Sequence, residues 1–80
     1  MKIPRSIGGS ELAQALQRYG YRVTRQTGSH LRLTTQHGGE HHVTIPAHES
    51  LRVGTLSAIL AEVAVHLQRD KQALMRELWG

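Results

Sequence analysis

Apolar residues recur along this chain with a helical spacing near both ends and a strand spacing in the middle. Between residues 10 and 19 they fall at i, i+3, i+4 and i+7, which predicts a helix with a single apolar stripe. The stripe consists of Leu12, Ala15, Leu16 and Tyr19. Gly8 or Ser10 can cap the start of this helix, and Glu11 complements the positive end of its dipole. Gly20 is placed to end it in the left-handed conformation.

The middle of the chain alternates apolar and polar residues, which is the spacing of β-strands. The alternation predicts three strands, at Tyr21–Gln26, His30–Gln36 and His41–Pro46. Two short glycine-containing segments, residues 27–29 and 37–40, supply the turns between them. The pattern therefore predicts an antiparallel meander that ends at Pro46.

The alternation also divides the meander into an apolar and a polar face. The inward set is apolar, and we expect helices to cover it. Its members are Tyr21, Val23, Leu31, Leu33, Val43 and Ile45. The outward set carries arginine and histidine and contains no large apolar residue. Its members are Arg22, Thr24, Gln26, His30, Arg32, Thr34, His42 and Thr44.

After a connecting loop at residues 47–54, the helical spacing returns. A second stripe predicts a helix that Thr55 caps and that runs to about Leu67. The members of this stripe are Leu56, Ile59, Leu60 and Val63. A last helix is predicted near Arg69–Leu78. Neither glycine nor proline separates the two helices, so the pattern leaves open whether they join.

These elements account for most of the 80 residues, so the sequence predicts one α+β domain over residues 1–80. The order is α-β-β-β-α with an additional C-terminal helix. The three-stranded antiparallel sheet carries its helices on one face.

Charge adds a partner class to this fold. The net charge is +4, and eight of the ten basic residues are arginine. The guanidinium group of arginine contacts phosphate oxygens in pairs, so this composition favours phosphate recognition. Charge alone gives only a weak preference for nucleic acid.

Three further features of the composition restrict the class of protein. The absence of cysteine excludes a disulfide scaffold and a thiolate zinc site, and it fits a reducing cytoplasm. Residues 1–5 lead into no apolar run, so we expect no signal peptide. No segment approaches the roughly 20 apolar residues that span a bilayer, so we expect no membrane partner.

His30 is the residue that the pattern singles out for chemistry. It follows the turn at residues 27–29 and begins a strand, within one strand pair of Arg22, Arg32 and His42. Cleavage of RNA without a metal needs a base for the 2′-hydroxyl proton, an acid for the leaving 5′-oxygen, and cations around the phosphoryl oxygens. Histidine suits the proton transfer near neutral pH, and arginine suits the phosphate. The alternative is an exposed histidine with polar neighbours and no catalytic role.

Three other histidines, His37, His41 and His42, suggest a metal site. Neighbours on a strand point to opposite faces, so His41 and His42 cannot both bind one ion in regular geometry. No HExxH motif or carboxylate triad accompanies them. We therefore expect neither a metal ion nor a cofactor, and a solvated turn and strand edge instead. His42 can still assist on the polar face.

The loop before the second predicted helix offers a further phosphate site. A helix N-terminus presents free N–H groups and a positive dipole end, which together hold phosphate. His48 and Arg52 stand close in sequence to the helix start at Thr55. The alternative is that His48 bonds within the loop and that Thr55 only caps the helix.

With these residues in place, five segments of the chain resemble the HicA family of bacterial toxins, also called YcfA-like mRNA interferases. The segments are Gly9–Leu12, Leu16–Tyr21, Arg25–His30, Val43–His48 and Gly54–Leu60. Each is short, but their order and spacing are specific, and they extend over nearly the whole chain. The stretch from about His66 to Gly80 is longer than a minimal member needs.

The resemblance implies a fold like that of double-stranded-RNA-binding domains. It implies endoribonuclease activity that cleaves mRNA and arrests translation, with the histidine of Gly28–Ser29–His30 as the catalytic residue. It also implies an antitoxin of the HicB family that covers the active site, in a higher-order toxin–antitoxin complex. The candidate RNA-binding residues are Arg22, Arg25, Ser29, Arg32, His48, Arg52 and Thr55.

Two questions stay open at this point. The family pattern supplies one histidine, so the second proton-transfer group is His48, His42, water or an arginine-polarised phosphate. The function itself has two alternatives to the metal-independent endoribonuclease toxin. One is a non-catalytic RNA-binding module of the same fold, and the other is a protein that only docks an acidic antitoxin.

Overall fold

The helices and strands follow one another along the chain in the predicted order. The computed structural model describes residues 6–79, so the expectation of no signal peptide in residues 1–5 lies outside the described residues. In chain order the elements are α1 (Gly9–Ala15), the 3₁₀ helix η1 (Leu16–Tyr19), β1 (Arg22–Gln26), β2 (His30–Thr35), β3 (His41–Pro46), α2 (Val53–Leu67) and α3 (Lys71–Trp79).

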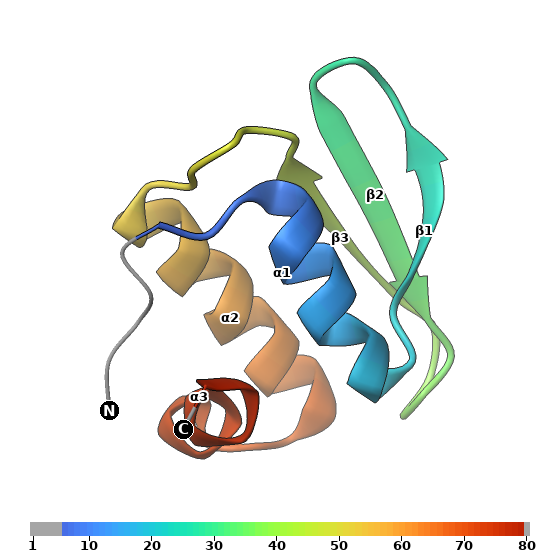
Figure 1. Cartoon of the computed structure of the whole chain (residues 1–80). Helices are drawn as coiled ribbons and strands as arrows, with labels where there is room; N and C mark the ends of the chain where they lie inside the picture. Colours follow the sequence, from blue (N-terminus) through green and yellow to red (C-terminus); the bar gives the residue numbers. More distant parts are fainter. Residues whose placement is uncertain (1–5, 80) are drawn as a thin grey trace.

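The three strands form one antiparallel sheet in the order β1-β2-β3, with the helices on one of its faces (Figure 1). α1 packs on β2 and β3, α2 packs on β3, and α3 packs on α2. This is the predicted α+β architecture, with the α-β-β-β-α order of a double-stranded-RNA-binding-like domain and one more helix at the C-terminal end. The other face of the sheet, which we call the outer face, carries no helix within residues 6–79.

Local contacts explain where α1 begins and ends. Gly8 is the N-cap residue, and its N–H donates to the Glu11 carboxylate over 2.9 Å, whereas Ser10 lies inside the helix. The last turn tightens into η1. Gly20, at φ +83°, then adopts the left-handed conformation that ends the helix, as predicted.

Gly9 allows α1 to approach the loop after β3 closely. Its N–H donates to the His48 carbonyl over 2.9 Å, and a Cβ atom at this position would collide with the Pro46 carbonyl oxygen. A second backbone bond runs from the Ala47 N–H to the Ser29 carbonyl over 2.9 Å. The start of α1, the β1–β2 turn and the β3–α2 loop are therefore fixed against one another at one end of the sheet.

The core forms from the helix stripes and the inward strand residues, except that Ala15 is only half-buried and Val23 is exposed. Its largest fully buried apolar side chains are Tyr21, Leu12, Leu16, Leu33, Ile45, Leu56, Leu60, Leu74 and Val63. Val23 is 45% exposed, so the prediction that it belongs to the core is wrong. β1 is an edge strand that extends beyond the helices (Figure 1). Val23 borders an open hollow of about 490 Å³ with Gln17 and Arg22. Alternation gives the direction of a side chain but not whether a helix covers it.

A β-bulge at Thr24 changes which side chains of β1 reach the outer face. Val23 pairs with Leu33 and Arg25 pairs with Arg32, so β1 has one residue more than β2 between these pairs. The extra residue reverses the inward–outward alternation beyond it. Arg25 therefore lies on the outer face, directly opposite Arg32.

The same bulge moves Gln26 to the helix side of the sheet. Gln26 pairs with Leu31, whose side chain is buried beneath the helices. The prediction that Gln26 faces outward is therefore wrong. Neither glycine nor proline marks the bulge in the sequence, so the alternation of side chains does not indicate it.

α2 begins earlier than predicted, and a short break separates it from α3. Arg52 is the N-cap residue of α2 and Thr55 lies inside its first turn, so the prediction that Thr55 caps the helix is wrong. Gln68, at φ +55°, ends α2 in the left-handed conformation. The Asp70 carboxylate then accepts the Ala73 N–H over 3.2 Å at the start of α3.

Candidate active site

His30 is the first residue of β2, and the preceding turn holds both its backbone and its ring. The Thr27 hydroxyl accepts hydrogen bonds from the N–H groups of Ser29 (3.3 Å) and His30 (3.1 Å). Ser29 Oγ lies 2.9 Å from His30 Nδ1. The side chain is exposed, and Nε2 is the ring nitrogen without a partner among residues 6–79. The alternation pattern does not indicate this role of Thr27, although a threonine at a tight turn commonly forms such side-chain-to-backbone bonds.

Two arginines accompany His30 on the outer face. Arg32 follows two residues along β2, and alternate strand residues share a face. Arg25 stands opposite Arg32 on β1 because of the bulge. All three side chains are exposed, so the structure places His30 on a polar, arginine-bearing surface, as predicted.

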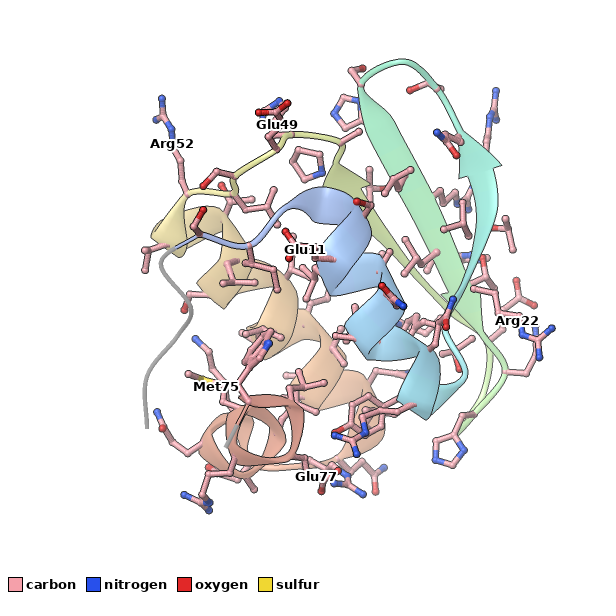
Figure 2. All side chains as sticks on the ribbon, viewed as in Figure 1. Glu11, Arg22, Glu49, Arg52, Met75 and Glu77 are labelled. Carbon is pink, nitrogen blue, oxygen red and sulfur yellow. The ribbon has the colours of Figure 1, made fainter. Side chains whose placement is uncertain are left out.

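Arg22 and His42 lie farther from His30 than predicted. They stand on either side of Thr34, which pairs with Arg22 on β1 and with His42 on β3. Thr34 is four residues from His30, and this corresponds to about 13 Å at the rise of a strand. Figure 2 shows Arg22 near the start of β1, at the opposite end of the molecule from Arg52. His42 is therefore too far away to transfer a proton at the phosphodiester that His30 would serve.

A hydrogen-bonded chain of four side chains crosses the outer face at the Thr34 level. Thr34 Oγ1 lies 2.8 Å from Thr24 Oγ1 and 2.7 Å from His42 Nδ1. His42 Nε2 in turn lies 2.9 Å from Glu40 Oε2. The chain ties the bulge residue to both other strands. The sequence did not indicate it, because its geometry depends on the register of all three strands.

The β3–α2 loop carries His48 and Arg52, and its first residue lies beside the turn before His30. The backbone bond between Ala47 and Ser29 joins this loop to the turn before His30. The Arg52 side chain points away from the body of the protein (Figure 2), beside the first N–H groups of α2. Thr55 is only half-exposed and lies within the first turn of α2. The loop thus offers polar groups beside the His30 turn.

The outer-face arginines differ from the arginines near α3 in their partners. Arg69 forms an ion pair with the Glu77 carboxylate, and Arg18 donates to the Glu77 carbonyl. Within residues 6–79, by contrast, the side chains of three outer-face arginines make no ion pair or hydrogen bond, and these are Arg22, Arg25 and Arg32. The outer face therefore presents the positive charge of these three arginines to solvent.

Comparison with protein families decides the identity of the chain. Residues 9–65 match the family model described as the HicA toxin of bacterial toxin–antitoxin. The chain belongs to the HicA toxin family. The comparisons with curated proteins and with solved structures found no match. The family match includes α1, the whole sheet and most of α2, so both His30 and the β3–α2 loop lie inside it. The match ends at residue 65, before α3, in agreement with the expectation that the stretch from about His66 to Gly80 is longer than a minimal family member needs.

Two further findings concern the described part of this HicA toxin. No helix within residues 6–79 is long and apolar enough to cross a membrane. Those residues also contain no group of three or more histidine, cysteine or acidic side chains arranged to hold a metal ion.

A second group of titratable side chains lies at the end of the sheet away from His30, on the helix side. His41 Nδ1 lies 2.7 Å from the Tyr21 hydroxyl, and its Nε2 lies 3.7 Å from Glu62 Oε1. Its ring stacks on that of His66 with centroids 4.3 Å apart. Burial, and then the neighbouring His66, lower the pKa of His41 below its ordinary value of 6.5. Burial, and then the Glu62 carboxylate, raise the pKa of Tyr21 to about 12.

This group predicts that the free energy of unfolding decreases as the pH falls from 7 to 5. The folded protein binds a proton at His41 less readily than the unfolded chain, whose histidine titrates near 6.5. The unfolded state therefore gains more protons as the pH falls through that value, and folding loses stability. Urea unfolding at several pH values measures the effect. The His41→Asn variant, which keeps a polar group near Tyr21, should show a shallower decrease. An equally steep decrease in that variant would assign the effect to another group.

Proposed function

We propose that this HicA-family toxin is a metal-independent endoribonuclease that cleaves mRNA and thereby arrests translation, with His30 as its proton-transfer residue. One observation carries the proposal. The His30 ring is exposed, fixed at Nδ1 by Ser29 Oγ (2.9 Å), and shares the outer face with Arg25 and Arg32. A proton-transfer group beside phosphate-binding cations is the combination that RNA cleavage requires.

The reaction begins at the 2′-hydroxyl next to the cleaved phosphodiester. His30 Nε2 accepts the 2′-hydroxyl proton while the 2′-oxygen forms a bond to phosphorus. The bond from phosphorus to the 5′-oxygen breaks, and the 5′-oxygen gains a proton and leaves as a hydroxyl group. The products are a 2′,3′-cyclic phosphate end and a 5′-hydroxyl end. Nε2 can act as the base only if Nδ1 carries the ring hydrogen, so Nδ1–H donates to Ser29 Oγ in both protonation states of the ring.

Arginine charge and one further group complete the proposed mechanism. Arg32 is exposed two residues from His30, and its guanidinium group stays charged at every working pH, so it can bind an RNA phosphate close to the reacting one. For the second proton transfer we favour His48, because its loop is bonded to the His30 turn, with water as the alternative. Proton transfer and arginine charge together supply the chemistry, so the mechanism requires neither a metal ion nor a cofactor.

The proposed partners follow from the same surface. mRNA is the substrate, and the protein would act in the cytoplasm, where mRNA is translated. A HicB-like antitoxin would inhibit it by covering His30 in a higher-order toxin–antitoxin complex. The exposed, positively charged outer face supports such a partner if the antitoxin contributes an acidic surface, since complementary charges favour association.

The test of this function is cleavage of purified mRNA by the purified toxin in the presence of EDTA. We expect cleavage to continue at the rate seen without the chelator, because no step depends on a metal ion. The fragments should carry 2′,3′-cyclic phosphate and 5′-hydroxyl ends, which end-labelling and mass spectrometry identify. Loss of cleavage in EDTA, or fragments with 5′-phosphate ends, would contradict the mechanism.

A non-catalytic RNA-binding module is the second candidate function. The distance of Arg22 from His30 along the sheet favours this candidate, because a basic group far from the histidine can bind RNA without taking part in cleavage. This candidate predicts RNA binding without cleavage by the wild-type protein. A protein that docks only its antitoxin predicts neither. The EDTA experiment and a measurement of RNA binding by the wild-type protein therefore together separate all three functions.

A further inference from the structure

We infer that Arg25 and Arg32 together bind one RNA phosphate that flanks the cleaved phosphodiester. The inference rests on the proposed function and specifies how the substrate strand is held. Its first support is the register of the sheet. Arg25 and Arg32 are direct partners across β1 and β2, and the side chains of such partners lie on the same face with their Cβ atoms about 5 Å apart.

Two arginines in this position repel each other. Like charges directly opposite one another destabilise a sheet, and neither side chain has an ion-pair or hydrogen-bond partner among the described residues. A phosphate bound between them removes the repulsion and accepts hydrogen bonds from both guanidinium groups. The geometry therefore favours an anion shared by the two arginines.

The bulge at Thr24 creates this pair, and the outer-face chain of hydrogen bonds holds the bulge in place. Without the extra residue, Arg25 would point toward the helices. Thr24 Oγ1 lies 2.8 Å from Thr34 Oγ1, and it also donates to the Arg32 carbonyl over 3.4 Å. Thr24 is thus a positioning residue, which acts on RNA only through the arginines.

The distance from His30 identifies which phosphate the pair would bind. Arg32 is two residues from His30, which places it about 7 Å farther along the strand. A phosphate between the two arginines therefore lies beside the phosphodiester that His30 serves, as the next phosphate of the same RNA strand does. The outer face carries no phenylalanine, tyrosine or tryptophan on which bases could stack. The site would hold the RNA backbone and add affinity without adding a base preference.

The salt dependence of RNA binding tests the site without any need for cleavage. The probe is a single-stranded RNA oligonucleotide, bound to the His30→Ala protein at a series of NaCl concentrations. Each phosphate contact contributes about 0.7 to the slope of log K against log salt for a single strand. We expect Arg25→Gln/Arg32→Gln to lower the slope by about 0.7, the value for one shared phosphate. Arg76→Gln, which removes an exposed charge from α3, is the control and should leave the slope unchanged.

Two outcomes of that experiment would overturn the inference. An unchanged slope would mean that the pair does not contact RNA. A decrease of about 1.4 would mean that each arginine binds a phosphate of its own. Both results stand whether or not the wild-type protein cleaves RNA, so the failure of this site is distinguishable from the failure of the proposed function.

Cleavage kinetics supply the second arm. A flanking phosphate is bound equally in the ground state and the transition state, so Arg25→Gln and Arg32→Gln should each raise KM about tenfold and leave kcat unchanged. Thr24→Val should raise KM in the same direction, and Thr24→Ser, which keeps the hydroxyl, should restore it. A decrease in kcat with an unchanged KM would instead assign the arginines to the cleaved phosphodiester.

Discussion

Replacing His30 with alanine should slow RNA cleavage by a factor of about 10²–10⁴, the usual contribution of a positioned acid–base group, and leave RNA binding intact. The ring is exposed at the start of β2 and is not part of the buried core, so the free energy of unfolding should change by no more than about 0.5 kcal/mol. Rate constants for cleavage of a purified mRNA, RNA dissociation constants and thermal melting measure the three effects. Expression of the variant in bacteria should no longer arrest growth.

His37→Ala is the matched control for this variant. His37 is also exposed, but it lies in the β2–β3 turn at the opposite end of β2 from His30, so its replacement should leave the cleavage rate unchanged. A His30→Ala protein that cleaves as fast as the wild type would remove His30 from the mechanism. A large decrease in its melting temperature would mean that the ring takes part in the packing of the fold.

Replacing Leu33 with alanine should reduce the free energy of unfolding by roughly 2–5 kcal/mol through the cavity that it opens. Leu33 is fully buried on β2, the central strand, beneath the helices. Small domains have a total stability of only about 5–15 kcal/mol, so this loss is a large share of it. Urea unfolding at pH 7 measures the change, and the midpoint should fall while the slope of the transition stays the same.

Val23→Ala is the matched control for Leu33→Ala. Val23 pairs with Leu33 across β1 and β2, but its side chain is 45% exposed. We expect the free energy of unfolding to fall by less than about 1 kcal/mol, because folding buries little apolar surface at this position. Equal losses in the two variants would contradict the finding that β1 extends beyond the helices.

The sequence predicted α1, the three strands, α2 and α3, because both kinds of spacing are clear and glycines mark the turns. It did not predict that the end of the first helix tightens into η1. It failed where tertiary contacts decide the outcome. The alternation assigned Val23 to the core, but no helix packs closely on β1. It assigned Thr55 as a cap, although the chain already turns into α2 at Arg52. No local sequence signal marks the bulge at Thr24, so the sequence alone does not predict on which face of the sheet Arg25 and Gln26 lie.

The sequence predicted only part of the candidate site, because strand alternation indicates the face on which a residue lies but not which residues of other strands lie near it. The position of His30 on a polar, arginine-bearing face follows from strand parity and from the turn before it. The long separation between His30 and His42 follows from the pairing of His42 with Thr34, which parity alone does not give. The contacts that fix the His30 turn to the β3–α2 loop are backbone bonds, and a sequence pattern cannot indicate them.

The backbone bonds from Gly9 to His48 and from Ala47 to Ser29 have a consequence for how such a toxin can diverge. Main-chain atoms form them, so most exchanges of the neighbouring exposed side chains would leave the turn where it is. A single mutation of one of those side chains could lower the affinity of an inhibitor that recognises it, while the backbone of the His30 turn keeps its position. A toxin and its inhibitor could in this way evolve new mutual binding specificity while the backbone of the toxin stays the same.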